Sequence, residues 1–399
     1  MFVEKLSSAL ATRVAVAATV NRRYAMLGLR AAGRHLKSGQ AKTIQQQELT
    51  VAKTESTIQV DGREIKLSNL EKVLYPKAGF TKSQVIDYYI RIAPVLLPHL
   101  ANRALTLKRY PNGVDGMHFY EKNCPSYRPE WMKTVKVWSE GNNKHMYYCT
   151  VADLPSLVWL GNLADLELHT SLSRAEKLDQ PTVIAFDLDP GPPATIVQCC
   201  QVGEWVREIF SGFGLEAFSK TSGSKGLQVY VPLNSAVSYD DTKMFAKAVA
   251  RLLEDRHPDL VVSDMKKALR SNKVFVDWSQ NDNYKTTVNV YSLRAKDQPT
   301  VSTPVSWKEV EECLKKGDPE LLVFTSDEVL KRVEKMGDLF EPVLTMKQKL
   351  PDIQGLSGEA VAPEKAKPAL KVAKTTKTAK AAKMAKPAKR TKTVQKRRG

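Results

Sequence analysis

Two kinds of hydrophobic pattern run through the first third of the chain. Alternating polar and apolar residues over 56–66 predict a β-hairpin. Apolar residues at helical spacing over 85–93 then predict an amphipathic helix, with Thr81 as its N-cap. Pro94 is expected to kink or end this helix, since proline lacks the backbone donor that a helix needs.

Short apolar strands alternate with helical patterns in the middle of the chain. Strand patterns cover residues 184–189, 228–232 and 273–277, and helical periodicity covers 202–213 and 240–254. With a further strand before residue 221, the order strand-helix-strand-strand-helix resembles the split β-α-β unit that carries carboxylates in many nucleic-acid enzymes. The pattern predicts an α/β (α+β) fold.

Composition places one globular body between two basic ends. Residues 365–399 hold fourteen Lys or Arg and no acid, and residues 1–50 hold eight basic and two acidic residues. Once the +14 and +6 of these ends are taken from the +18 of the chain, residues 51–364 carry a formal charge of −2. The basicity that favours a nucleic-acid partner therefore lies in the ends.

These observations predict three segments. Residues 1–50 are expected to form a basic arm that is disordered or partly helical, or to include an overlong start upstream of Met26. Their Arg-rich, acid-poor composition also mimics a transit peptide. Residues 51–353 form the globular body between these ends. Residues 354–399 form a disordered Lys-, Ala-, Thr- and Pro-rich tail, which is expected to bind DNA as a flexible polycation.

Candidate chemistry begins with Asp187 and Asp189 at the end of an apolar strand. Residues two apart share a strand face, so both carboxylates project together, and a divalent cation would relieve their repulsion. A solvated strand end is the common alternative for an isolated Asp-x-Asp. Asp277 ends a second β-branched strand and favours the metal interpretation, with two Mg²⁺ or Mn²⁺ ions as the expected cofactors.

A Gly-, Ser- and Lys-rich turn at residues 221–227 separates these strands. Glycine lets a backbone approach an anion closely, while Ser222 and Lys225 add a hydroxyl donor and a positive charge. The turn lacks the spacing of a Walker A loop and leads into a strand. Carboxylates beside a phosphate-binding turn are typical of two-metal phosphoryl transfer.

Six motifs in order make a family resemblance specific. The chain from about residue 65 to 350 resembles the polymerase domain of bacterial ATP-dependent DNA ligase D, a member of the archaeo-eukaryotic primase superfamily that acts in non-homologous end joining. The motifs are residues 107–113 (LKRYPNG), 119–123 (FYEKN), 187–190 (DLDP), 222–226 (SGSKG), 276–281 (VDWSQN) and 291–295 (YSLRA).

The resemblance implies a primase-like core of mixed or antiparallel sheets flanked by helices. It also implies a monomeric nucleotidyltransferase that adds nucleotides, with a preference for ribonucleotides, to 3′ ends at gaps and double-strand breaks. Stimulation by Mn²⁺, nucleoside triphosphate substrates, 5′-phosphorylated gapped DNA and Ku are the expected cofactors and partners. No Lys-x-Asp-Gly ligase motif is present, so a separate ATP-dependent ligase is expected.

Site residues carried over by the resemblance fall into three groups. Asp187, Asp189 and Asp277 are the expected catalytic residues and metal ligands. The expected nucleotide contacts are Lys108, His169, Ser222, Lys225, Gln228, Arg270, Gln280 and Arg294. The expected DNA contacts are Lys72, Lys82, Arg109, Phe119 and Tyr120, although lysines placed like Lys72 and Lys82 also occur as an ordinary solvated face.

One departure and two other functions stay open. Gln228 stands where the family commonly has histidine; glutamine can hydrogen-bond a phosphate but cannot become cationic. A de novo primase shares the superfamily chemistry, and a DNA-binding accessory protein without catalysis would share the basic ends. The complete set of three carboxylates argues against the accessory protein.

Cysteine usage and hydropathy indicate a cytoplasmic, nucleoid-associated protein. The five cysteines show no C-x-x-C spacing and are expected to be reduced thiols rather than a zinc site or a disulfide framework. No segment is long and apolar enough to predict a transmembrane helix.

Overall fold

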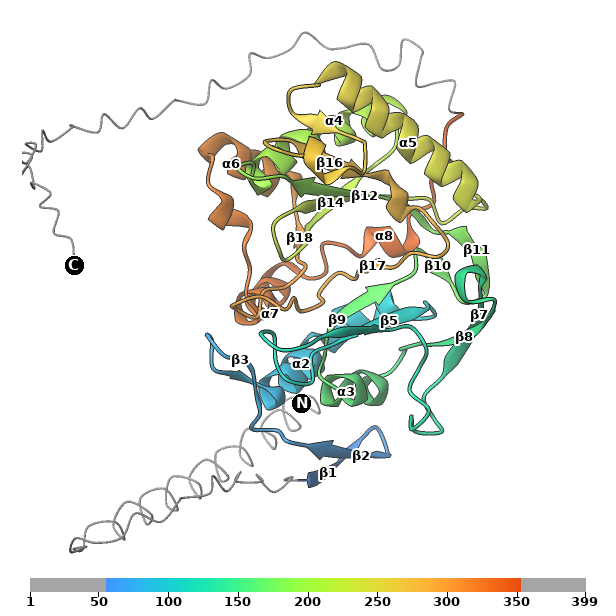
Figure 1. Cartoon of the computed structure of the whole chain (residues 1–399), viewed down its shortest axis with the longest axis vertical. Helices are drawn as coiled ribbons and strands as arrows, with labels where there is room; N and C mark the ends of the chain where they lie inside the picture. Colours follow the sequence, from blue (N-terminus) through green and yellow to red (C-terminus); the bar gives the residue numbers. More distant parts are fainter. Residues whose placement is uncertain (1–54, 353–399) are drawn as a thin grey trace, which may run out of the picture. The chain divides into compact units, whose positions relative to one another are not determined.

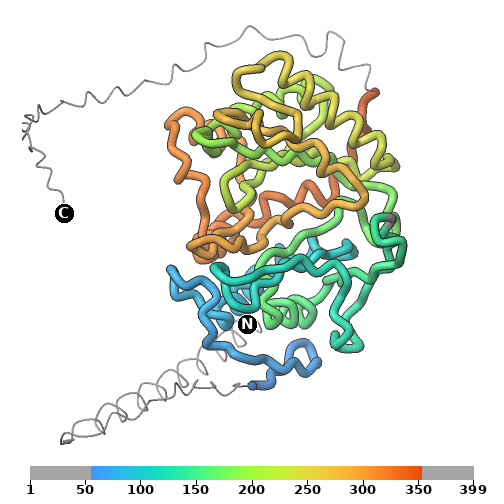
Figure 2. The backbone as a smooth tube through the Cα atoms, viewed as in Figure 1, coloured from blue at the N-terminus to red at the C-terminus, as the bar shows by residue number. Residues whose placement is uncertain are grey.

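The computed structural model describes residues 55–352. The predicted arms at 1–50 and 354–399 lie outside these residues. Within the described body, two six-stranded sheets face each other, and the backbone passes from the first sheet to the second near residue 183 (Figures 1 and 2).

The first sheet has the order β17-β9-β5-β8-β7, with β6 also paired to β5. All its pairs are antiparallel. Its strand β17 comes from far along the chain, so the sheet is completed by a segment that follows five of the six strands of the second sheet. The strands are β5 (Leu105–Arg109), β6 (Phe119–Glu121), β7 (Thr134–Ser139), β8 (Lys144–Cys149), β9 (Asp165–Thr170) and β17 (Thr287–Val288).

The second sheet has the order β15-β16-β12-β14-β13-β18. Only the β15–β16 pair is parallel within it. The predicted strand-helix-strand-strand-helix order is confirmed as β12-α4-β13-β14-α5. The strands are β12 (Val183–Pro190), β13 (Phe218–Thr221), β14 (Leu227–Pro232), β15 (Val261–Val262), β16 (Val274–Asp277) and β18 (Pro304–Val305).

Helices cover the outer faces of the two sheets. In Figure 1, α4 and α5 lie over the second sheet, and α2 and α3 lie over the first. The helices are α2 (Lys82–Leu100), α3 (Leu154–Asn162), α4 (Ile196–Gly212), α5 (Tyr239–Arg256), α6 (Trp307–Lys316), α7 (Ser326–Met336) and α8 (Pro342–Thr345). None of the helices within 55–352 is long and apolar enough to cross a membrane.

Helix α2 confirms one prediction and narrows another. Thr81 caps it, and a capping box links Thr81 with Gln84. Of the two outcomes expected at Pro94, a kink or an end, the end does not occur, because α2 continues to Leu100, and the kink stays a prediction. Leu96 and Leu100 are fully buried beyond the proline, so packing against the first core outweighs the hydrogen bond that Pro94 removes.

Three small hairpins complete the secondary structure. The predicted hairpin over 56–66 is confirmed as β1 (Glu55–Val60) and β2 (Arg63–Ser68). The others are β3 (Val73–Tyr75) with β4 (Phe80–Thr81), and β10 (Ser173–Arg174) with β11 (Lys177–Pro181).

Strand alternation directs polar side chains to the space between the sheets. Phe186 and Leu188 of β12 belong to the core beneath α4, so the alternate residues of β12 face the other way. Leu166 and Leu168 of β9 likewise belong to the core of the first sheet. The polar positions of both strands therefore face inward, toward each other.

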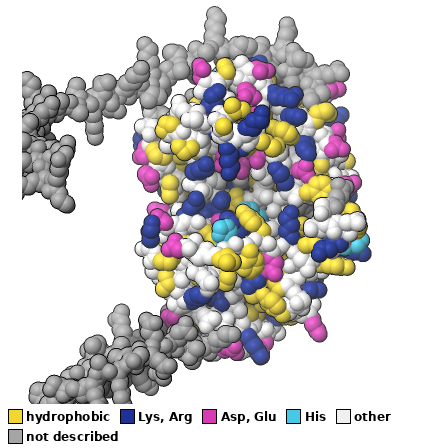
Figure 3. All heavy atoms as spheres, viewed as in Figure 1, with side chains coloured by type: hydrophobic (Ala, Val, Ile, Leu, Met, Phe, Trp, Pro, Cys, Tyr) yellow, Lys and Arg dark blue, Asp and Glu magenta, His cyan; other side chains and the backbone are white. Residues whose placement is uncertain are grey.

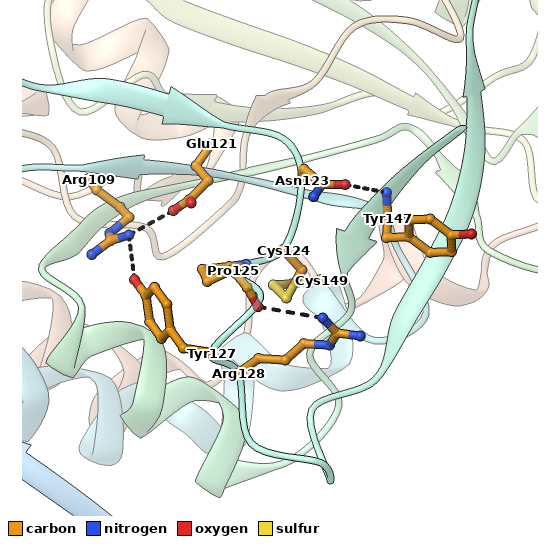
Figure 4. The surroundings of a disulfide bond; sticks show 9 residues. All are labelled: Arg109, Glu121, Asn123, Cys124, Pro125, Tyr127, Arg128, Tyr147 and Cys149. Atoms are coloured by element: carbon orange, nitrogen blue, oxygen red, sulfur yellow. Dashed lines mark hydrogen bonds and ion pairs between the residues drawn. A yellow bond between two sulfur atoms is a disulfide. The ribbon is translucent and has the colours of Figure 1, made fainter. Parts of the chain in front are cut away.

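A disulfide corrects the prediction that all five cysteines are reduced. Cys124 and Cys149 are bonded, with sulfurs 2.12 Å apart, whereas Cys199, Cys200 and Cys313 are free and buried. The spacing of the cysteines in the sequence does not reveal this pair. Cys124 lies beside the end of β8 through a tertiary contact, in which its backbone N–H donates to the carbonyl of Tyr147. Figure 4 shows the bond below the β6 strand end.

Candidate active site

Four polar side chains form a row across the second sheet. In the strand register, Lys220 pairs with Gln228, Gln228 with Asp187, and Asp187 with Asp277. The Lys220 ammonium donates to the side-chain amide oxygen of Gln228, and Gln228 stands between Lys220 and Asp187 in this row. The register therefore brings together two of the predicted catalytic carboxylates, and Asp189 follows two residues along the same face of β12.

Asp187 is the least satisfied carboxylate of this row. Its Oδ1 atom is buried without a hydrogen-bond partner. Burial, together with the charges of Asp189 and Asp277, raises the pKa of Asp187 to about 7, although the bond with Gln228 opposes the rise. An orphaned carboxylate oxygen beside two more carboxylates fits the donor set of Mg²⁺ or Mn²⁺. A bound cation would favour the ionised form.

Asp277 is held by the short turn that follows it. Its Oδ1 accepts hydrogen bonds from the backbone and hydroxyl of Ser279, and its Oδ2 accepts one from Gln280 at 2.8 Å. Gln280 thus contacts a predicted ligand, while its predicted nucleotide contact stays a prediction. Within residues 55–352, no group of three or more His, Cys, Asp or Glu side chains is gathered as a metal site, so the three-carboxylate set also stays a prediction.

The predicted phosphate turn is shaped by two glycines. Gly223 has a φ of +67°, and a Cβ there would lie 2.6 Å from the Ser302 backbone nitrogen. A Cβ on Gly226 would lie 2.3 Å from the Leu188 carbonyl oxygen. The Ser222 hydroxyl accepts from the backbone of Gly226 at 3.1 Å, so the hydroxyl closes the turn from inside. A larger residue at Gly223 or Gly226 would therefore displace the backbone of the turn or of its neighbours.

The other basic residues beside this turn are partly engaged. Lys225 donates to the carbonyl of Pro190 at 3.2 Å, which ties the turn to the end of β12. Arg270 stacks on Phe275, with its guanidinium carbon 3.7 Å from the ring centroid. Its Nε atom is buried without a hydrogen-bond partner. Arg270 therefore packs against β16, which is the strand that ends in Asp277.

On the inner face of the first sheet, three predicted nucleotide contacts meet one carboxylate. The Glu167 side chain is 2% exposed, and its Oε2 lies 3.2 Å from Lys108 Nζ, 3.1 Å from His169 Nε2 and 3.4 Å from Arg294 Nε. Burial alone would raise the pKa of Glu167, but the hydrogen bond with His169 and the charges of Arg294 and Lys108 hold it well below its usual range. Burial lowers the pKa of His169, while Glu167 opposes the change.

Arg294 joins the two sheets. Its Nη1 donates to the Ser222 carbonyl in the phosphate turn, and its Nε lies beside Glu167 of β9. Tyr75 anchors the same segment from the core side by donating to the Arg294 carbonyl at 3.1 Å. Lys220 makes a second link, because its ammonium also donates to the carbonyl of Val288 in β17 at 3.1 Å.

Both predicted template aromatics are accessible, and Tyr120 lies beside this cluster. Phe119 is 40% exposed and Tyr120 is 59% exposed. The Tyr120 ring packs edge-on against His169, with centroids 5.9 Å apart. Arg109 lies over Phe119 but also forms a 2.8 Å ion pair with Glu121, as Figure 4 shows, so its guanidinium is already engaged.

Lys72 and Lys82 are brought together by the β3–β4 hairpin. The backbone N–H of Lys82 donates to the carbonyl of Lys72 at 2.8 Å. Lys72 is exposed and donates to Asn112, whereas Lys82 is only 6% exposed and donates to the carbonyl of Ser68 at 2.7 Å. Burial, with Lys72 and Arg109 nearby, lowers the pKa of Lys82 to about 8. Lys82 is therefore not an ordinary solvated lysine.

Three residues of the site were not predicted. Glu167 and Lys220 are charged residues in otherwise well-buried strands, and that mismatch is the signal that points to them. Lys296 follows Arg294, and although burial is the main cause, the charges of Arg294, Lys108 and Lys225 also lower its pKa. In Figure 3, Lys and Arg side chains gather along the middle of this face, over the region between the sheets.

Comparison with known proteins gives the family. Residues 81–340 match the family described as the LigD primase-polymerase domain, and the chain belongs to that family. It is 39% identical to the solved polymerase domain of Mycobacterium tuberculosis ligase D in complex with DNA, with a TM-score of 0.66 over 71% of this chain and 99% of that one.

Two longer relatives agree. The multifunctional non-homologous end joining protein LigD of Mycolicibacterium smegmatis is 42% identical over 281 residues, which are 70% of this chain and 36% of that protein. The bifunctional LigD of Bacillus subtilis is 32% identical over 274 residues, 68% of this chain and 43% of that protein. The chain thus spans well under half the length of these relatives.

Proposed function

We propose that this chain is a template-dependent nucleotidyltransferase that adds nucleotides, preferably ribonucleotides, to DNA 3′ ends at gaps and double-strand breaks during non-homologous end joining. One observation carries the proposal. The register of β12 and β16 sets Asp187 opposite Asp277, on the sheet face turned toward the Lys108, His169 and Arg294 cluster. Carboxylates on one side and basic side chains on the other suit a metal-bound triphosphate.

Asp187, Asp189 and Asp277 would hold two Mg²⁺ or Mn²⁺ ions. Bound ions would activate the attacking 3′ oxygen and steady the leaving pyrophosphate. The orphaned Oδ1 atom of Asp187 supports this assignment. The chain itself orients the substrate: Gln280 and Ser279 fix Asp277, and Arg294 and Lys225 present positive charge at the phosphate turn.

DNA is the proposed polymer substrate. The solved relative with this fold binds DNA. Exposed Phe119 and Tyr120 fit stacking on template bases, which contributes about 1–3 kcal/mol per base. Lys72 and Lys82 are the proposed site for a downstream 5′-phosphate. Ku and an ATP-dependent ligase activity are the proposed partners, because the longer relatives are end-joining proteins.

A primer-extension assay on gapped DNA tests this function. The purified chain is incubated with a labelled primer, each nucleotide type and either Mn²⁺ or Mg²⁺. Template-directed addition with a faster rate for ribonucleotides is expected. A single-stranded circle without primer serves as the comparison, since synthesis there would favour a de novo primase. Binding of gapped DNA without any incorporation would favour an accessory role and overturn the proposal.

The basic tail is tested separately. Deleting residues 360–399 is expected to weaken binding to DNA of any sequence and to flatten its salt dependence, since each neutralised phosphate contributes a slope of about 0.9 in log K against log salt. Incorporation at saturating DNA is expected to survive. An unchanged salt slope would assign the tail to a protein partner instead.

A further inference from the structure

We propose that Glu167 is a positioning residue of the nucleotide site. Its carboxylate fixes Lys108, His169 and Arg294 so that three basic side chains from separate segments can bind one triphosphate. This inference rests on the proposed function, because the nucleotide contacts of those three residues are part of it. It deepens that function by naming the residue that assembles the site.

The two carboxylate oxygens of Glu167 contact different groups. Oε2 lies 3.1–3.4 Å from the three basic side chains. The Arg294 contact is an ion pair without hydrogen-bond geometry. Oε1 accepts from the backbone N–H of Ala295 at 3.1 Å and from the Tyr110 hydroxyl at 3.3 Å. Glu167 therefore holds the segment of Arg294 at both its backbone and its side chain.

The three basic residues reach Glu167 from different places in the chain. Lys108 lies on β5, His169 lies on β9 with Glu167, and Arg294 follows β17. In the register of β5 and β9, Lys108 is directly opposite Glu167. Without a shared anion, the side chains of Lys108 and Arg294 would repel each other in a place with little solvent to screen them.

The charge balance leaves the site ready for an anion. One carboxylate faces two permanent cations and one titratable imidazole, so a positive excess remains. A lone buried carboxylate would be costly, whereas one that accepts from four donors and pairs with an arginine is stabilised. The positive side chains are thus held close together while most of their charge stays available to a phosphate.

Substitution separates this role from a merely structural one. Glu167→Gln keeps the shape but loses the charge and one acceptor oxygen, and Glu167→Asp keeps the charge on a shorter side chain. Glu309→Gln is the matched control, because Glu309 of helix α6 is also an acidic residue in an ion pair, with Arg332 of helix α7 at 2.6 Å. With the full chain on gapped DNA, Glu167→Gln is expected to raise the nucleotide KM roughly tenfold or more. Its kcat and the Kd for gapped DNA should stay within roughly threefold of wild type.

Two further measurements keep the test independent of catalysis. The Kd for ATP, measured by calorimetry without DNA, is expected to rise with the KM, and Glu167→Asp is expected to recover part of the loss. NMR titration of the His169 ring should show a lower pKa in Glu167→Gln, because the hydrogen bond and the negative charge that favour the imidazolium are gone.

The outcomes distinguish the two proposals. A wild-type KM and ATP Kd in Glu167→Gln would overturn the positioning role. So would a joint fall of kcat, DNA binding and melting temperature beyond that of Glu309→Gln, because a collapsed fold explains all three. If the wild-type chain incorporates no nucleotide but binds ATP more tightly than Glu167→Gln does, the proposed function fails and the positioning role stands.

Discussion

The two sheets meet at the site with opposite excesses of charge. On the second sheet, Asp187 and Asp277 share a row with a buried lysine, Lys220, which is 1% exposed and whose pKa is lowered by burial to about 7. On the first sheet, basic side chains surround one buried anion, Glu167, which is 2% exposed. In each half a buried residue of one charge lies close to residues of the opposite charge.

In both sheets, side chains of like charge are held close together before a ligand binds. Glu167 contacts the basic side chains around it directly, and Lys220 acts on Asp187 through its charge, so each relieves part of the repulsion and leaves an excess. The negative excess would be completed by cations, and the positive excess by an anion. A metal-bound triphosphate carries both charges, so one ligand would satisfy both sheets.

The largest expected effect comes from removing a carboxylate on the second sheet. Asp187→Asn or Asp277→Asn should lower nucleotide incorporation by on the order of a thousandfold, because each carboxylate is a proposed metal ligand. Primer extension measures the loss, and gel-shift binding to gapped DNA should change little. Asp255→Asn, an exposed residue of α5, is the control. Near wild-type extension by either variant would remove that residue from the metal site.

Removing the buried lysine of the second sheet should act mainly on stability. Lys220→Met deletes hydrogen bonds to Gln228, Val288 and Ser302 and leaves the carboxylates without their buried lysine. A loss of about 3 kcal/mol in the free energy of unfolding is expected, measured by urea denaturation. Lys247→Met on α5 provides the comparison. An unchanged midpoint would show that the link between the sheets through Lys220 contributes nothing.

The disulfide sharpens the comparison because it lies in the first-sheet half alone. Cys124→Ser opens a crosslink between residues 25 apart and should lower the free energy of unfolding by about 2–4 kcal/mol, while incorporation persists below the melting temperature. Cys313→Ser is the control, since Cys313 is buried and free. Mass spectrometry of a non-reducing digest checks the bond directly, and two free thiols at 124 and 149 would contradict it.

The smallest effect concerns pH at Lys82, in the proposed site for a downstream 5′-phosphate. Burial lowers the pKa of Lys82 to about 8, so its positive charge is present below that pH and is lost as the pH rises through it. The preference for 5′-phosphorylated over 5′-hydroxyl gaps should therefore fall several-fold between pH 7 and pH 9. Lys82→Ala should abolish both the preference and its pH dependence. A flat profile in the wild type would separate Lys82 from phosphate recognition.

Local patterns predicted the parts of the fold that depend on neighbours in the chain. The hairpin of β1 and β2, the capping of α2 by Thr81 and the unit from β12 to α5 followed from periodicity and capping chemistry. Pro94 does not end α2, because tertiary burial of the residues after it outweighs its local cost. The cysteine pair was missed because it depends on the contact between Cys124 and β8.

The site was predictable as a set of residue types but not as an arrangement. Asp187 and Asp277 are far apart in the chain, and only the pairing of β12 with β16 sets them opposite each other. The proposed role of Glu167 depends on its contact with Arg294, which comes from a distant part of the chain. No local sequence pattern shows that contact. Gln228 could be read as a phosphate contact, yet the structure sets it between Lys220 and Asp187.

The late arrival of β17 has a consequence for synthesis of the protein. Thr287 and Val288 pair with β9, and the first core also contains residues up to Val343. At about 5–20 residues per second, a ribosome that has just made β9 needs roughly 6–25 s more to deliver β17 and Arg294. During that interval β9 is an open edge and Glu167 lacks its arginine. The nascent chain therefore exposes a strand edge that can pair with other chains, and a chaperone that covers it should raise the yield of folded protein.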